Sequence, residues 1–293
     1  MLVTSSSRGV ALLGAIVFAA VACPGPAQAS DEIFDARGFK ANRPMSSQLP
    51  YEHIDPLNGN LLLVFTDLSL PGNAGFDLKI QRTYNSKIFR DELFGAIDWD
   101  SWAGIGWSLH LGRVRTTQAD LPLAAERPDG SSHKLFPNFV GGTAPVTNAA
   151  RFVTRDYWLY DAGTANTPPT LVLTNGLLYT LGKVVSFGSG NYYRYPTRIE
   201  DAFGNKVEIE YDTVAQAPDA MKKITQYLGP SDNPGAQKRE VTFSTEVVDG
   251  GNRARLRTMT FLGRTWTFTS VASSEANKSR LTAVQPPVGR PWK

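Results

Sequence analysis

The chain has 293 residues, of which 42% are hydrophobic and 11% aromatic, and this apolar content excludes a wholly disordered protein. The formal charge of +3 comes from 30 basic and 27 acidic residues that are interspersed along the chain. Because no basic tract appears, the composition gives no indication of nucleic-acid binding.

The first 29 residues are typical of a signal peptide. Arg8 precedes a short apolar run at residues 9–22, and the sequence AQA at residues 27–29 has the form that signal peptidase cleaves. The run is shorter than the roughly 20 residues that span a bilayer. We therefore predict cleavage after Ala29 and no membrane span in the mature chain, which would be secreted, periplasmic or on the cell surface. An uncleaved anchor and lipid attachment at Cys23 are the alternatives.

Cys23 is the only cysteine, so cleavage after Ala29 leaves none. The mature protein would then have neither disulfides nor thiolate metal sites, and its fold would rest on packing.

Strand patterns dominate the rest of the chain. Residues 30–50 are polar and aperiodic, which predicts a flexible N-terminal arm. From residue 51 onward, apolar and polar residues alternate in segments such as FDLKIQRTY (76–84), KVEIEYD (206–212) and TWTFTSV (265–271), with Gly and Pro between them. No amphipathic helix of three or more turns stands out. We predict an all-β fold of antiparallel hairpins. A weak, irregular repeat after residue 191 leaves two arrangements open, a stack of hairpins and an ordinary sandwich.

Asx-Gly pairs mark the expected hairpin turns. Asn58-Gly59 has the residues of a type I′ turn, and Asp55 is placed to accept hydrogen bonds from backbone N–H groups in that turn. Asp129-Gly130 and Asn175-Gly176 have the same chemistry.

Five stretches carry a family resemblance. They are DPLNGNLLLVFTDLSLPG (55–72), FDLKIQRTYNSK (76–87), GIGWSLHLG (104–112), RPDGSSHKL (127–135) and TRIEDAFGNKVEIEYD (197–212). The first four, in this order and spacing, resemble the N-terminal conserved region of Rhs/YD-repeat proteins. The last resembles one YD repeat, with Tyr211-Asp212 as the pair that gives the repeat its name.

The resemblance implies a β-ribbon that forms a partial or complete β-shell around a toxin or other cargo. It also implies a conserved β region at 51–190 and incomplete YD-repeat-like hairpins at 191–293. The structural motif residues that it implies are Asp55, Asn58, Gly59, Arg82, Tyr84, Asn85, Gly104, Gly106, Trp107, Asp129, Gly130, Gly204, Asn205, Tyr211 and Asp212.

The sequence departs from the family at its C-terminal end. It stops about where most members continue into further repeats, and the family's self-cleaving Asp-Pro motif is absent there. We therefore expect a downstream YD-repeat or cargo segment as a partner. We also expect the apolar residues of the last strands to lack a covering neighbour; these are Val241, Phe243, Met259, Phe261, Trp266 and Phe268.

Candidate chemical sites are weak. His53, His110 and His133 lie in separate segments, no G-x-S-x-G motif accompanies them, and they lack zinc-ligand spacing. We predict no catalytic residue, no cofactor and no metal site. A hydrolase that uses a histidine and scattered acids ranks last among the functions considered.

Aromatic clusters are the more informative feature. Trp107 and its neighbours are expected to fill the core, because each ring buries a large area. The alternative is that Trp99, Trp102, Tyr157 and Trp158 stack on a glycan or on a partner at the cell surface. The favoured function is thus a non-catalytic exported structural protein, and the alternative is a secreted carbohydrate- or partner-binding β-module.

Overall fold

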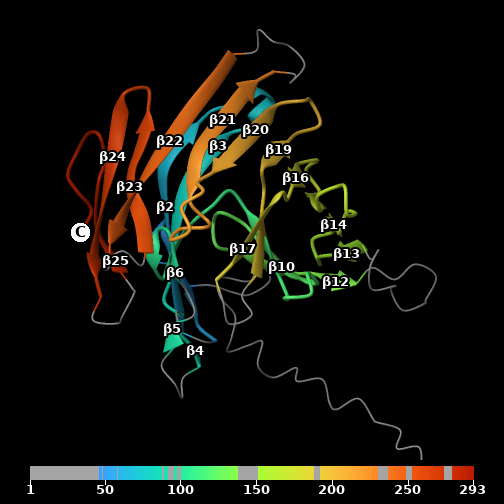
Figure 1. Ribbon diagram of the computed structural model, residues 1–293, viewed down its shortest axis with the longest axis horizontal. Helices are drawn as coiled ribbons and strands as arrows, with labels where there is room; N and C mark the ends of the chain where they lie inside the picture. Colours follow the sequence, from blue (N-terminus) through green and yellow to red (C-terminus); the bar gives the residue numbers. More distant parts are fainter. Residues whose placement is uncertain are drawn as a thin grey trace, which may run out of the picture.

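The computed structural model describes residues 46–47, 49–57, 59–87, 89–91, 96–97, 100–137, 151–187, 192–229, 237–248, 253–273 and 279–293. The predicted signal peptide (1–29), most of the predicted arm (30–50), Asn58 and Trp99 lie outside them. The described residues form strands joined by short loops, with one 3₁₀ turn, η1 (Asn73–Gly75), and no α-helix (Figure 1). The all-β prediction is confirmed. No helix in these ranges is long and apolar enough to cross a membrane.

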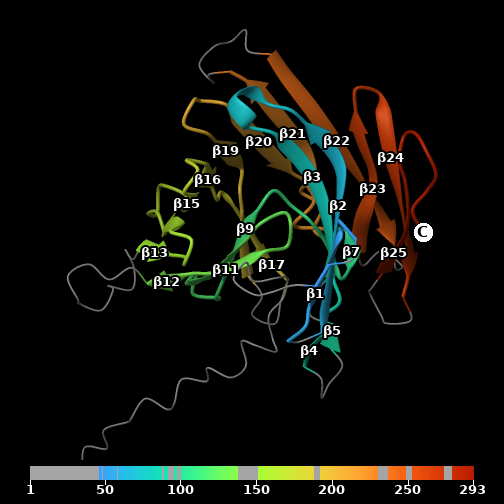
Figure 2. The ribbon, with the colours of Figure 1, turned by 180° about the vertical axis from the view of Figure 1, so that it is seen from behind.

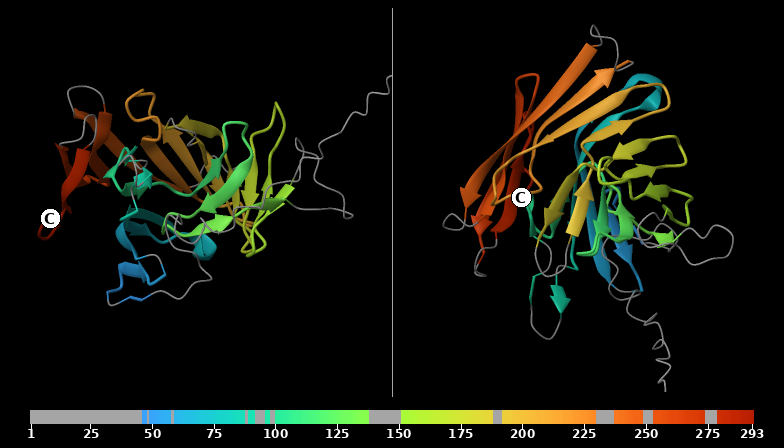
Figure 3. Two further views of the ribbon diagram at one scale, coloured as in Figure 1. Left: turned by 90° about the horizontal axis from the view of Figure 1, so that it is seen from below. Right: turned by 45° about the vertical axis from the view of Figure 1, so that its right-hand side comes forward.

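The largest sheet has twelve antiparallel strands, and each pairs with the sheet's next strand along the chain. Its strands are β12 (Phe136–Pro137), β13 (Arg151–Val153), β14 (Leu159–Asp161), β15 (Thr170–Val172), β16 (Leu178–Thr180), β19 (Arg198–Glu200), β20 (Lys206–Tyr211), β21 (Met221–Leu228), β22 (Gln237–Val248), β23 (Arg253–Phe261), β24 (Arg264–Ala272) and β25 (Ser279–Gln285). Figure 3 shows the strands fanning from the yellow-green β13–β16 end to the red β25 end.

A four-stranded sheet packs on one face of the long sheet (Figures 1 and 2). Its order is β1 (Glu52–Asp55), β2 (Asn60–Leu70), β3 (Leu78–Asn85) and β8 (Trp107–Leu109). Alternation in β3 points Leu78, Ile80 and Arg82 inward, while Lys79 is exposed. The period-2 pattern in the sequence therefore predicted the buried face of this strand correctly.

A five-stranded sheet lies beside this sandwich. Its order is β11 (Ser132–Lys134), β10 (Pro122–Glu126), β9 (Arg113–Thr116), β18 (Tyr192–Tyr195) and β17 (Lys183–Ser186). Two small pairs complete the strands, β4 (Phe89–Asp91) with β5 (Ala96–Ile97) and β6 (Asp100–Ser101) with β7 (Gly104–Ile105). Because β9 pairs with β18 and β16 pairs with β19, the expected regions 51–190 and 191–293 share two sheets.

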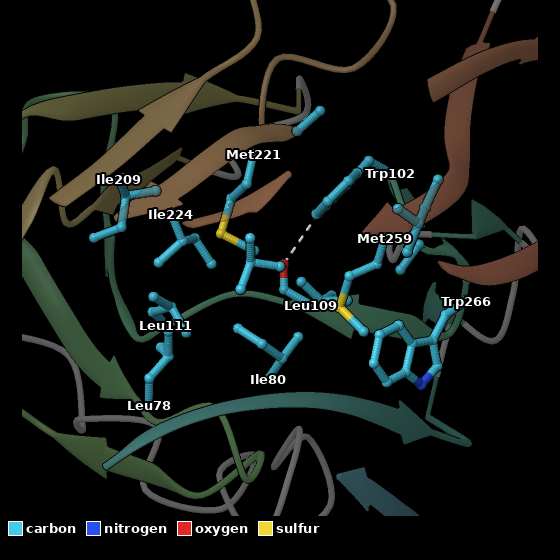
Figure 4. Packing of buried hydrophobic residues seen from close by; sticks show 14 of the residues in the cluster. Leu78, Ile80, Trp102, Leu109, Leu111, Ile209, Met221, Ile224, Met259 and Trp266 are labelled. Atoms are coloured by element: carbon cyan, nitrogen blue, oxygen red, sulfur yellow. Dashed lines mark hydrogen bonds between the residues drawn. The ribbon is translucent and has the colours of Figure 1, made fainter. Parts of the chain in front are cut away.

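The main core fills the space between the four-stranded and twelve-stranded sheets (Figure 4). Leu78 and Ile80 from β3 face Ile209, Met221 and Ile224 from the long sheet, all of them buried. The residues of the last strands join the same core: Val241, Met259, Trp266 and Phe268 are buried, and Phe243 and Phe261 are partly buried against it. The expectation that these side chains lack a covering neighbour is wrong, because they pack in the core between the two sheets, where Trp102 of the β6–β7 hairpin contacts Phe243 and Arg82 of β3 contacts Phe268.

Five hairpin loops in the described chain share one geometry. In each, the first residue donates its N–H to the carbonyl of the fifth and accepts the N–H of the fourth. The loops are 117–121, 127–131, 154–158, 173–177 and 201–205, with Asp120, Gly130, Tyr157, Gly176 and Gly204 at the fourth position, all at positive φ. Asp129-Gly130 and Asn175-Gly176 therefore do make hairpin turns, in the longer form that is built on a type I turn and a bulge.

The prediction of a two-residue type I′ turn at Asn58-Gly59 is wrong. Asp55 pairs with Asn60, so four residues rather than two join β1 to β2. The Gly59 N–H donates to the Asp55 carbonyl at 2.8 Å, and the Asp55 carboxylate accepts the Leu57 N–H at 2.9 Å, as predicted for that side chain. A two-residue loop instead joins β23 to β24 at Leu262-Gly263, where both residues have positive φ.

Gly130 is more tightly enclosed than Gly176, the other Asx-Gly turn glycine. Gly130 and Gly176 have nearly the same φ, +82° and +83°. A Cβ on Gly130 would lie 2.6 Å from Thr83 Cγ2, whereas a Cβ on Gly176 would meet only Ala202 Cβ at 3.7 Å. Both positions would pay about 1–2 kcal/mol for a left-handed L-residue, but only Gly130 adds a clash inside the fold.

We predict that Gly130→Ala lowers the free energy of unfolding by roughly 1–3 kcal/mol more than Gly176→Ala, which is the usual range for overpacking. Urea melts of the two variants and the parent protein measure the difference. Equal losses in the two variants would contradict the clash.

Candidate functional site

Arg82 is a buried cation between the two large sheets. Its guanidinium makes a bidentate contact with Asp67 of β2, with Nε 2.5 Å from Oδ2 and Nη2 2.9 Å from Oδ1. Only 3% of the Arg82 side chain and 8% of the Asp67 side chain are exposed. Asp67 is the extra residue of a β-bulge, because the register of β2 with β3 shifts between Thr66 and Leu68.

Aromatic rings surround this pair. The Arg82 Cζ lies 5.5 Å from the Phe65 ring, 5.2 Å from the Trp107 ring and 5.6 Å from the Phe268 ring. Phe65 and Trp107 come from the four-stranded sheet and Phe268 from β24, so one cation contacts both layers. The motif prediction named Arg82 and Trp107, and the structure brings them together. It did not name Asp67, because the bulge that places this residue has no sequence signal.

Two other motif residues, Tyr84 and Asn85, contact the segment that contains Trp107. Tyr84 pairs with Trp107 across β3 and β8, with ring centroids 5.3 Å apart. The sequence predicted that Trp107 fills the core. In the structure it packs against the core but is only partly buried. Asn85 donates its N–H to the Gly106 carbonyl at 2.8 Å. These residues hold β8 against β3.

The β6–β7 hairpin inserts Trp102 into the main core. Trp102 is 1% exposed, and its Nε1 donates to the Leu109 carbonyl at 3.0 Å. Its own carbonyl accepts the Leu256 N–H at 2.9 Å. A Cβ on Gly104 would lie 3.2 Å from the Leu281 nitrogen of β25, which confirms a close backbone approach at this glycine. The ligand-stacking alternative is wrong for Trp102, because the core encloses its ring.

A buried ionisable cluster forms where the five-stranded sheet meets the sandwich. Arg113 donates to Glu126 (Nε–Oε2, 2.7 Å) and to the Tyr195 hydroxyl (Nη1–Oη, 3.0 Å), and its Cζ lies 4.3 Å from the Tyr193 ring. His110 accepts the Gly112 N–H at Nδ1, at 3.0 Å. Burial, reinforced by the Arg113 charge, holds the pKa of His110 well below its usual 6.5. His110 therefore stays neutral, in the form that can accept this bond.

Asp219 is the buried acid nearest to Trp102. It is 3% exposed, and its carboxylate accepts the Trp102 N–H at 3.3 Å. Burial raises the pKa of Asp219 to about 6, although hydrogen bonds from backbone N–H groups and the charges of Arg113 and Arg255 oppose the shift. Sequence reasoning missed this residue, because nothing local distinguishes it from an exposed loop acid.

Ser131, His133 and Asp156 form a hydrogen-bonded chain whose order matches that of a hydrolytic triad. His133 Nδ1 lies 2.5 Å from Asp156 Oδ2, and Nε2 lies 3.2 Å from Ser131 Oγ. The Ser131 hydroxyl is also 2.7 Å from Asp129 Oδ1, and Ser131 is 2% exposed. A buried hydroxyl that already has a shorter bond to a carboxylate is poorly placed to attack a substrate. These hydrogen bonds join the 127–131 loop to the 154–158 loop through His133.

Trp158 packs against the histidine of this network. Its ring centroid is 3.9 Å from that of His133, and it is 6% exposed, so the ligand-stacking alternative is wrong for Trp158 as well. Tyr157, in contrast, is 80% exposed.

The residues of the YD motif close a hairpin. The Tyr211 hydroxyl donates to the Pro196 carbonyl at 2.8 Å, and the Asp212 N–H donates to the Ala220 carbonyl at 2.8 Å. Gly204 has φ +81°, and the buried Asn205 donates Nδ2 to Asp201 Oδ2 at 2.7 Å. Among the described residues, no group of three His, Cys, Asp or Glu side chains is arranged to hold a metal ion.

Residues 51–135 match a family described as Domain of unknown function (DUF6531). This range contains the first four motif stretches. No curated protein matches the chain.

Among solved structures, the chain is similar to the N-terminal domain of the effector protein SpvB from Salmonella typhimurium strain LT2. The identity is 15% and the TM-score 0.45, over 75% of this chain and 98% of that one. It is also similar to a chain of the Photorhabdus luminescens Tc holotoxin pore, at 10% identity and TM-score 0.48, over 86% of this chain and 16% of that one. The corresponding values for TcdB2-TccC3 are 11% and 0.45, over 84% and 16%.

The Arg82–Asp67 pair gives the first prediction for this site. Arg82→Met leaves the Asp67 carboxylate buried without its counter-charge and should lower the free energy of unfolding by about 3–5 kcal/mol. The double variant Arg82→Met/Asp67→Leu removes both charges and should recover most of that loss. Urea melts of the three proteins test this. A double variant no more stable than the single one would show that the aromatic packing of Arg82, rather than the charge pair, is what matters.

Asp219 gives the second prediction, which concerns pH. Its folded pKa of about 6 lies above the unfolded value of about 3.9, so between these values the folded state keeps a proton that the unfolded state has released. The stabilisation from this group is complete below about pH 4 and is lost as pH rises through about 6, with a total of roughly 3 kcal/mol.

Asp219→Asn should therefore be more stable than the parent at about pH 7 and lose this advantage near pH 4. Denaturant melts across this range give the difference between the two proteins, which isolates Asp219 from the other titrating groups. His110 acts in the opposite direction, because its lowered pKa makes the parent lose stability as pH falls below about 6.5. A difference that does not change with pH would contradict the raised pKa of Asp219.

Proposed function

We propose that this chain is a non-catalytic, exported structural protein, the N-terminal shell-forming portion of an Rhs/YD-repeat protein. The observation that carries the proposal is the sheet from β12 to β25, in which twelve strands follow one another as a continuous antiparallel ribbon. A sheet with this strand order can be extended at its end by further hairpins of the same kind. A shell made of sequence repeats requires this property.

The positions of the motif residues support this role. Arg82, Trp107 and Tyr211 contact other parts of the fold, and Gly104 allows β7 to approach β25. These residues join the sheets to one another, which is what a structural motif requires. Export would follow from the predicted signal peptide, and the proposed partners are a downstream YD-repeat segment and the cargo, such as a toxin, that the shell would enclose.

The reading frame after residue 293 gives the test of the shell proposal. We expect DNA sequencing to find further YD repeats in frame or in an adjacent coding segment, followed by a cargo domain. In the full product, protease should then spare the cargo domain, and Arg82→Met should expose it to digestion. A cargo domain digested equally fast in the presence and absence of residues 51–293 would overturn the proposal.

The Ser131–His133–Asp156 chain gives the test of the non-catalytic part. A screen of ester, peptide and glycoside substrates with the purified protein should show no turnover above background. Ser131→Ala is the decisive variant and Ser69→Ala, at an exposed serine of β2, is its matched control. Turnover that Ser131→Ala abolishes and Ser69→Ala leaves intact would replace the structural proposal with a hydrolase.

A further inference from the structure

β25 is the strand at one end of the twelve-stranded sheet, and Figure 2 shows it beside the marked C-terminus. In the described part of the chain, β24 is the one strand that forms a ladder with it. Its other edge, called the outer edge below, would present a row of backbone N–H and C=O groups if nothing lay along it. Such an edge is a template for pairing with another chain.

The β6–β7 hairpin covers the first part of the outer edge. A Cβ on Gly104 would lie 3.2 Å from the Leu281 nitrogen and 3.5 Å from the Ser279 carbonyl oxygen. Because β24 pairs with the opposite edge at Leu281, the β7 backbone lies along the outer one. This contact reaches residues 279–281 and leaves residues 282–285 to be covered by another part of the chain.

Residues 286–293, called the strap below, cover that second part. The Val284 N–H donates to the Trp292 carbonyl at 3.0 Å, and the Trp292 N–H donates to the Val284 carbonyl at 2.9 Å. This is the reciprocal pair of an antiparallel ladder. Gln285 Nε2 closes the turn of the strap by donating to the Pro286 and Gly289 carbonyls, at 2.8 and 3.1 Å. The Trp292 ring lies 5.5 Å from the Phe65 ring, so the strap also reaches β2.

The residues of the strap make it a poor template for a further strand. Because Trp292 turns its N–H and C=O toward β25, the backbone groups of its two neighbours point away from the sheet. One neighbour, Pro291, has no N–H, and the other, Lys293, is an exposed charge. Proline and lysine are residues with which natural sheets block their edges. β12, at the other end of the same sheet, also carries a proline, Pro137.

The strap is held by few contacts, whereas the strand beneath it is firmly packed. Trp292 is 56% exposed and Val288 is 81% exposed. Val284 is 3% exposed, belongs to the main core and pairs with Phe268 of β24. Release of the strap would therefore bare the outer edge at residues 282–285 without unfolding β25.

We propose that the strap is a releasable guard on a strand-pairing surface, and that the bared edge of β25 pairs with β25 of a second copy of this chain. Two copies carry the same edge, so a twofold axis between them places the two strands antiparallel, as in the rest of the sheet. A ladder limited to residues 282–285 binds weakly, so the dimer should form only as protein concentration rises. The proposal does not depend on the shell, because a strand that continued from Lys293 would extend the strap rather than displace it.

Trp292→Pro releases the strap, because it removes both the ring that contacts Phe65 and the N–H that donates to Val284. Light scattering on the mature chain should show a monomer for the parent at every concentration and a mass that rises toward a dimer for the variant. Hydrogen exchange gives a second measurement. In dilute variant the Val284 amide should exchange about tenfold faster than in the parent, as expected for one lost hydrogen bond, and it should slow again as the dimer forms.

Two further variants separate pairing through β25 from general association. Val288→Ala, at an exposed residue of the same strap, should behave like the parent. Trp292→Pro/Gln285→Lys places a charge at the bared edge of both copies and should stay monomeric while the Val284 amide still exchanges fast. The proposal fails if the parent dimerises as readily as Trp292→Pro, or if Trp292→Pro stays monomeric at every concentration. A dimer that Gln285→Lys leaves intact would also overturn it, because the copies would then meet elsewhere.

Discussion

Burying Arg82 constrains how the two large sheets pack. A guanidinium cannot leave water without a counter-charge and several hydrogen bonds, and Asp67 supplies both through a β-bulge that adds one residue to β2. The rings of Phe65, Trp107 and Phe268 then enclose the cation from both layers. Sliding one sheet over the other would move Phe268 away from Arg82. The Arg82–Asp67 pair therefore fixes the position of the four-stranded sheet relative to the twelve-stranded sheet more specifically than apolar packing alone would.

Other polar groups fix the remaining contacts between layers. The Trp102 hairpin reaches the long sheet through the Leu256 N–H of β23, and it contacts Asp219 in the loop before β21. Arg113 joins β9 to β10 and β18 through Glu126 and Tyr195. Each of these groups is buried, and each has a partner that is distant in sequence. The fold thus combines a large apolar core with a few buried polar contacts that are costly to break.

The two proposals divide the molecule into an interior and a surface. Residues that resemble the Rhs/YD-repeat motif act inside, where they join strands and sheets.

The sequence by itself determined the strands and many of their buried faces, because a period of two is a local property of the chain: Leu78 and Ile80 could be assigned to the core in advance. It also located the turns at Gly130 and Gly176, since positive φ favours glycine. Only the tertiary structure decided that four residues form the loop at Gly59, that Trp102 is buried, and that Trp266 packs in the main core. It also decided which acids meet Arg82 and His133. Each of these depends on which strands pair and which layers stack, and that pairing joins residues whose separation along the chain carries no local signal.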